Sequence, residues 1–114
     1  MSKRKPDVYL QDILESIIQI EEYLDNVNEY EFYQSSEKQD AVLRRLEIIG
    51  EAVKHISEEI RDKYDDIPWR KIAGMRDIII HEYFGITLSM VWVVAKRDLP
   101  KLGSRIEEII EKES

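Results

Sequence analysis

The chain has 114 residues, of which 43% are apolar and 36% are charged, and it carries a formal net charge of −7 and no cysteine. This length allows one domain with its own core and is too short for two, so we expect a single domain over residues 1–114. Without cysteine, disulfides and thiolate-bound metals are excluded. The acidic balance argues against a general nucleic-acid coat, which needs massed lysine and arginine.

The first residues are basic, but acidic residues such as Asp12 and Glu15 soon follow them. A signal peptide would need an uninterrupted apolar run at this place. No stretch approaches the roughly 20 apolar residues of a membrane span. We therefore expect a cytoplasmic protein with no membrane partner.

Apolar residues that step by three and four predict a first helix with one apolar face. Asp7, which follows Pro6, is its expected N-cap. Residues 26–33 break the pattern and predict a short connection. The apolar face consists of Leu10, Ile13, Ile17, Ile20 and Leu24.

A second long helix is predicted from a cap at Ser35 or Ser36 to about Lys63-Tyr64. Gly50 lies beside its apolar stripe and, because it has no side chain, would let a neighbouring helix approach closely. The stripe follows steps of four and three through Val42, Leu46, Ile49, Val53, Ile56 and Ile60.

Pro68-Trp69 predicts the start of a third, shorter helical region, which we expect to be interrupted or bent near Gly74 and to run to about Tyr83. Gly85 is its expected C-terminal stop.

Thr87 is the expected cap of the last helical region, in which Pro100 predicts a kink or two abutting helices. We expect the acidic end, residues 107–114, to fray. Together these elements predict an all-α, up-and-down bundle of four to five helices.

The most informative stretch runs from Met75 to Tyr83 and contains Arg76, Asp77 and His81. On one helix, positions 76 and 81 lie about 140° apart around the axis. One straight helix therefore cannot aim both side chains at one phosphate. A bent helix or a twofold dimer, which supplies a second copy of the motif, would solve this.

These residue types suit RNA cleavage without a metal. That reaction needs a base, an acid and a positively charged group that stabilises the phosphorane. His81 can act as the base, with the other protomer's His81 as the acid. Arg76 suits the phosphate, because its guanidinium is always charged and binds two oxygens at once. Asp77 can orient the imidazole, and Arg70 and Lys71 form a positive island with Arg76 that can contact RNA.

Structural alternatives stay open for each of these residues. Arg76 and Asp77 can simply pair on a helix surface while His81 packs in the core, and the positive island can be ordinary surface charge. His55 is expected on the surface. Trp69 and Trp92 can stack on bases or pack between helices. No pattern for a metal site or a cofactor is present.

Four stretches together resemble the HepT-like branch of the HEPN superfamily, in order and over nearly the whole chain. The signature Arg-x4-His-x-Tyr of that branch is matched by Arg76, His81 and Tyr83. The stretches are Leu46-Glu-Ile-Ile-Gly-Glu-Ala-Val-Lys54, Ile67-Pro-Trp-Arg-Lys-Ile-Ala-Gly-Met-Arg-Asp77, His81-Glu-Tyr-Phe-Gly85, and Val91-Trp92 with Leu99-Pro100.

The resemblance implies an all-α, homodimeric ribonuclease toxin of a two-component toxin–antitoxin pair. It implies Arg76 and His81 as catalytic residues, with RNA, and tRNA in particular, as the substrate class. The implied partner is a minimal nucleotidyltransferase antitoxin that transfers AMP to Tyr83. Some HEPN proteins are binding modules instead, so a non-catalytic protein that holds this partner is the alternative.

Overall fold

The computed structural model describes residues 6–81 and 88–114, with side chains described for 8–77 and 88–114. The described residues are helices joined by short turns, and they contain no strand.

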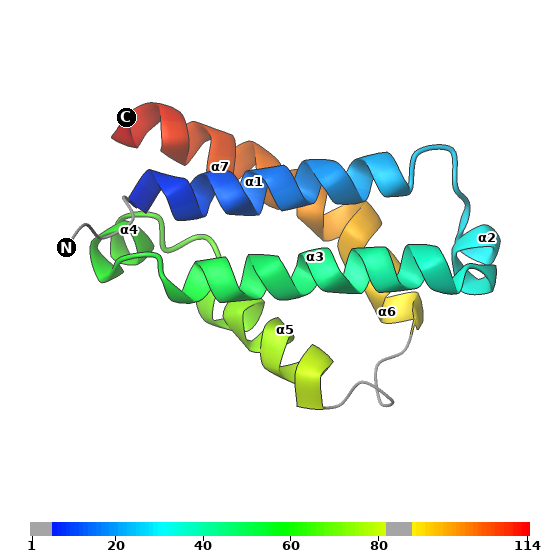
Figure 1. Cartoon of the computed structure of the whole chain (residues 1–114). Helices are drawn as coiled ribbons and strands as arrows, with labels where there is room; N and C mark the ends of the chain where they lie inside the picture. The colour runs from blue at the N-terminus through cyan, green and yellow to red at the C-terminus, as the bar shows by residue number, and fades with distance from the viewer. Residues whose placement is uncertain (1–5, 82–87) are drawn as a thin grey trace.

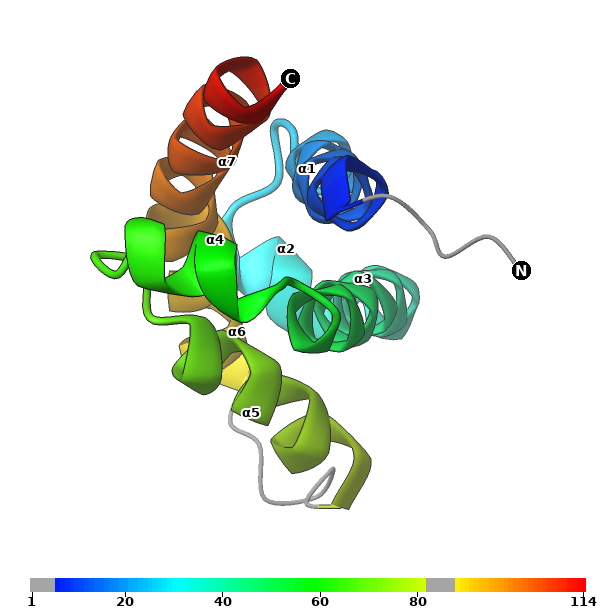
Figure 2. The same ribbon diagram turned by 90° about the vertical axis from the view of Figure 1, so that its left-hand side faces the viewer.

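Four long helices form a bundle, so the predicted all-α fold is confirmed. They are α1 (Pro6–Tyr23), α3 (Ser36–Lys54), α5 (Trp69–His81) and α7 (Leu99–Glu113). Figure 1 shows α1 and α3 side by side and antiparallel, with α5 crossing α3 on the side away from α1. Figure 2 shows that α7 covers the other flank of α1, so α1 and α3 are the central pair.

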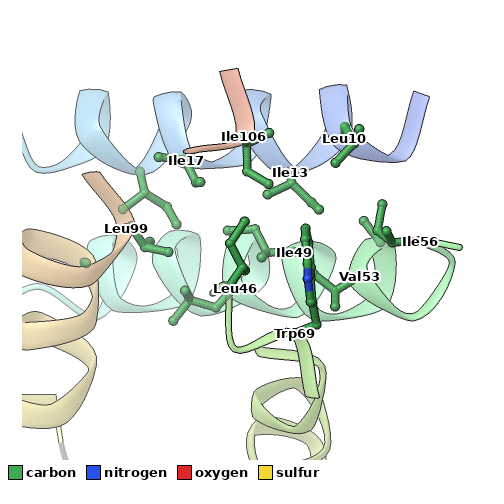
Figure 3. Packing of buried hydrophobic residues seen from close by; sticks show 14 of the residues in the cluster. Leu10, Ile13, Ile17, Leu46, Ile49, Val53, Ile56, Trp69, Leu99 and Ile106 are labelled. Carbon is green, nitrogen blue, oxygen red and sulfur yellow. The ribbon is translucent and has the colours of Figure 1, made fainter. Parts of the chain in front are cut away.

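The core lies where α1, α3 and α7 meet (Figure 3). The predicted apolar face of α1 is buried along its length, and the stripe of α3 is buried opposite it. Burying one such aliphatic side chain fully stabilises the fold by about 1.5–3 kcal/mol.

Both tryptophans pack within the fold. Trp69 is buried and its indole N–H donates to the carbonyl of Tyr64 at 3.0 Å, while Trp92 is half-buried with its ring centroid 5.5 Å from that of Phe32.

Residues 29–33 of the predicted connection lie in a short helix instead. α2 (Glu29–Gln34) begins after Asn28, whose side chain accepts the backbone N–H of Glu31 at 2.8 Å. The Glu31 carboxylate accepts the backbone N–H of Asn28 in return, at 3.0 Å. This reciprocal cap satisfies two N–H groups that would otherwise lack partners. The predicted cap at Ser35 is confirmed for α3.

The prediction of one helix from Ser35 to Tyr64 was wrong. α3 ends at Lys54, and α4 (Glu58–Lys63) begins after a turn in which Ser57 is the N-cap. Arg61 donates to the carbonyl of Val53, in the last turn of α3, and to the carbonyl of Ile56, in the turn that follows. The apolar spacing continues across the turn, because Ile56 and Ile60 are both buried, and the pattern therefore conceals the break.

The interruption predicted near Gly74 as one of two possibilities is absent, because α5 is one helix from Trp69 to His81. α1 begins at Pro6, so Asp7 lies inside the helix and is not its cap; proline is favoured at such a first position. Tyr83, Gly85 and Thr87 lie outside the described residues.

The interruption predicted at Pro100 is present as a change of helix type. α6 (Leu88–Val93) leads into a π-helical turn, η2 (Val94–Asp98), and α7 follows with Pro100 in its first turn. Proline has no N–H and its ring clashes with the carbonyl four residues earlier, so the regular α-helical bonding cannot continue through it.

We predicted that the acidic end would fray, but α7 continues to Glu113. The Glu113 carboxylate accepts the hydroxyl of Tyr64 at 2.6 Å and pairs with the ammonium of Lys63 at 2.8 Å. None of the described helices is both long enough and apolar enough to span a bilayer.

The carboxylate of Glu113 should make part of the stability depend on pH. Its hydrogen bond with Lys63, followed by that from Tyr64, lowers the pKa of Glu113 below its ordinary value. A lowered carboxyl pKa adds stability above the unfolded-state pKa and loses it as the pH falls through the folded-state pKa. Glu113→Gln should therefore unfold at lower urea concentration than wild type at pH 7. The difference should shrink as the pH falls below the ordinary glutamate pKa of about 4.3 and through the lowered pKa of Glu113 in the folded protein, where its carboxylate is protonated. A difference that is unchanged by pH would contradict this role.

Candidate active site around Arg76

Arg76 sits at the point where α5 crosses α3, and Gly50 makes this crossing possible. A Cβ atom placed on Gly50 would lie 2.6 Å from the Cβ of Arg76 and 3.3 Å from the carbonyl oxygen of Ile72. These separations are shorter than van der Waals contact, so only glycine fits. The predicted close approach at Gly50 is thus confirmed, and the helix that approaches is the one that carries Arg76.

The guanidinium of Arg76 is held by acidic groups on two helices. Its Nε is 3.0 Å from Oε2 of Glu51 on α3, and its Nη1 is 3.5 Å from Oδ1 of Asp77 on α5. The side chain is 31% exposed. A guanidinium has five N–H donors in a planar fork, so these two contacts leave donors that can bind a phosphate oxygen.

Asp77 is bound more closely to α3 than to its neighbour on α5. The ammonium of Lys54 donates to Oδ1 of Asp77 at 3.2 Å, whereas the contact with Arg76 is at the limit of a hydrogen bond. The hydrogen bond from Lys54 is the main cause that lowers the pKa of Asp77 below its ordinary value. The surface pair of Arg76 and Asp77 therefore exists, but each residue has a closer partner on α3.

His81 is the last residue of α5, and its side chain is not described. Because α5 is continuous from position 76 to position 81, the two positions do lie about 140° apart around its axis. The role of Asp77 in orienting the imidazole stays a prediction. Tyr83, the predicted modification site, lies outside the described residues.

A groove of about 420 Å³ opens beside Arg76 between α1 and α3. His55 lies there on the surface, as predicted, with its ring stacked on Tyr9 at a centroid distance of 4.9 Å. Its Nε2 is 3.6 Å from Oε1 of Glu51. The groove is lined among others by Tyr9, Arg44, Glu47, Glu51, His55 and Arg76. Sequence reasoning missed Glu51 and Lys54 as neighbours of the motif, although both lie within four residues of the predicted contact at Gly50.

Arg70 and Lys71 are exposed near the start of α5. Lys71 lines a different groove, of about 410 Å³, between α5 and the η2–α7 region, together with Lys101 and Arg105. The structure therefore does not gather the three cations of the predicted island around one cavity. Within the described part of the chain, His, Asp and Glu side chains form no group of three or more that could hold a metal ion.

Comparison with known proteins matches residues 13–109 to the family described as Ribonuclease HepT-like. The chain belongs to this family. The match spans α3, α5 and Arg76, so the described site lies within the family domain. No solved structure matches the chain.

Several curated proteins resemble the chain over most of its length. A Methanocaldococcus jannaschii protein named as a gamma-glutamylcyclotransferase and putative RNase is 51% identical over 92% of this chain, which spans only 47% of that relative. A second protein of the same organism, named as a putative RNase, is 40% identical over 94% of this chain and 98% of its own length. A Thermococcus cleftensis protein named as a probable ribonuclease HepT is 41% identical over 94% of this chain and 97% of its own length.

The crossing at Gly50 predicts opposite effects for two glycine-to-alanine substitutions. Gly50→Ala should lower the free energy of unfolding by about 1–3 kcal/mol, because the added methyl group forces α5 away from α3. Gly74→Ala should raise it by about 0.5–1 kcal/mol, because a Cβ there meets nothing within 4 Å and alanine favours the helix. Urea denaturation measures both. Equal stability of Gly50→Ala and wild type would mean that the two helices are not in close contact at this point.

Proposed function

We propose that the protein is a metal-independent endoribonuclease, the toxin of a type II toxin–antitoxin pair, that acts on cytoplasmic RNA, with tRNA as the expected substrate. The observation that carries this proposal is the placement of Arg76: a guanidinium fixed at a helix crossing, partly exposed beside a groove. Membership of a family described as ribonucleases supports the reaction class.

In the proposed reaction a ribose 2′-OH attacks the adjacent phosphorus. A histidine base removes the 2′-OH proton, and Arg76 stabilises the charge that develops on the phosphorane oxygens. A second acid then protonates the 5′-oxygen as it leaves. The products are a 2′,3′-cyclic phosphate and a free 5′-OH, so the step needs no cofactor and no net proton.

We propose that two protomers share this reaction. Positions 76 and 81 diverge by about 140° on α5, which makes it difficult for one copy to direct both groups at one phosphate. In a twofold homodimer, the two copies of His81 can act as base and acid on either side of a phosphate held by Arg76. Asp77 is the supporting residue of this arrangement.

Substitution of the two motif residues tests the chemistry. Purified Arg76→Ala and His81→Ala proteins should fold normally and cleave RNA in EDTA at least about 100-fold more slowly than wild type, because each removes charge stabilisation or proton transfer. Gel analysis of RNA incubated in the chelator measures the rate. Undiminished cleavage by either variant removes that residue from the mechanism.

Lys71→Ala and Arg70→Ala serve as matched controls on the same helix. Their exposed charges can contact the RNA backbone but lie away from the groove of Arg76. They should raise KM and weaken its dependence on salt, with kcat nearly unchanged.

We further propose that a minimal nucleotidyltransferase neutralises the toxin by transferring AMP to the hydroxyl of Tyr83. The added nucleotide would bring bulk and a negative phosphate to the site, and both oppose binding of an RNA backbone. The intact mass of protein coexpressed with such a partner should increase by whole AMP units, and Tyr83→Phe should abolish the increase. Neutralisation without any gain in mass would argue for inhibition by contact alone.

A non-catalytic module that holds the nucleotidyltransferase is the second candidate function. The acidic surface favours it, since the chain has a net charge of −7 and carboxylates contact Arg76 on both helices. This alternative predicts a stable complex with the partner and no cleavage of RNA by wild-type protein in EDTA.

A further inference from the structure

Glu51 is the closest described anionic partner of Arg76, and the fold places it there. It follows Gly50 directly on α3, so the contact that seats α5 also sets the separation between the carboxylate and the guanidinium. Oε2 of Glu51 lies 3.0 Å from Nε of Arg76, whereas Asp77 approaches no closer than 3.5 Å. A carboxylate bound to Nε restrains the rotation of the guanidinium plane.

We propose that Glu51 is a positioning residue of the active site, which fixes Arg76 through Nε so that the Nη1–Nη2 end of the guanidinium faces the phosphate. This inference rests on the proposed ribonuclease function. A phosphate prefers two parallel N–H donors. With Nε bound to Glu51, the fork left for a phosphate is the Nη1–Nη2 end, where the only described contact is the long one from Nη1 to Asp77 at 3.5 Å. Glu51 touches no reacting atom in this role and acts through Arg76 alone.

The negative charge of Glu51 and its positioning role have opposite effects on activity. A carboxylate near an RNA phosphate repels it, so removal of the charge alone should strengthen RNA binding. Loss of positioning should instead slow the chemical step, because a displacement of about 1 Å in a catalytic group can cost about 100-fold in rate. Measuring KM and kcat separately therefore distinguishes the two roles.

Glu47 provides a matched control in the same groove. It is one turn away on α3, it carries the same charge, and its described partner is Arg44, at 3.7 Å. Glu47→Ala changes the net charge and the groove as Glu51→Ala does, but it leaves the contact to Arg76 intact.

We would measure kcat and KM for RNA cleavage in EDTA with the full chain. Glu51→Ala should lower kcat by about 10- to 100-fold, while Glu47→Ala should leave kcat unchanged and lower KM. Glu51→Gln, which retains an oxygen acceptor for Nε, should recover most of the lost kcat. A Glu51→Ala protein with wild-type kcat overturns the proposal, as does equal loss of kcat in the two alanine variants. If Glu51→Ala fails to fold, a Glu51→Gln protein that loses as much kcat as Arg76→Ala overturns it also.

A second readout separates this proposal from the proposed function. The readout is the exchange of the Arg76 Nε proton with solvent, followed by NMR, with the resonance assigned by its loss in Arg76→Lys. This proton should exchange slowly in wild type and rapidly in Glu51→Ala. If wild type cleaves no RNA, the ribonuclease proposal fails, and this resonance alone decides whether Glu51 holds Arg76. Identical exchange in the two proteins would show that it does not.

Discussion

The close crossing of α5 over α3 at Gly50 is the constraint on which the site depends. A helix that carries any side chain at position 50 would hold α5 further away, because a Cβ there overlaps the Cβ of Arg76. The near contact brings Arg76 within reach of Glu51 and brings Asp77 within reach of Lys54. The absence of a side chain at Gly50 thus determines which groups surround Arg76, the residue proposed to bind the phosphate.

The ion pairs around Arg76 orient its side chain more than they stabilise the fold. The ion pairs around Arg76 are partly exposed, with side-chain exposures from 31% to 53%, and exposed pairs contribute little to stability. Their value lies in orientation, since a guanidinium held on one edge has fewer orientations to lose when it binds a phosphate. The proposed RNA site is therefore local, and it does not depend on the overall charge of the protein, which is acidic.

Apolar periodicity identifies the buried faces of the helices but does not report where a helix breaks. The apolar steps of α1 and α3 predict their buried faces correctly, because the same 3.6-residue repeat governs both the sequence and the packing. This periodicity does not reveal the turn at residues 55–57, since Ile56 within the turn and Ile60 after it are both buried in the core. There a serine cap and the hydrogen bonds of Arg61 end one helix and start another. The Asn28 cap of α2 likewise depends on a local exchange of hydrogen bonds that apolar spacing does not report.

From the residues alone one can obtain the helical class, the core faces, the special status of Gly50 and the family signature at Arg76 and His81, because each is a property of local pattern or composition. The partners of Arg76 and Asp77 on α3 come only from the folded chain. Glu51 and Lys54 are far from the motif in sequence, and only the packing of α5 on α3 brings them to it. The separation of Lys71 from Arg76 into two grooves has the same origin, since it depends on which helices flank α5 on each side.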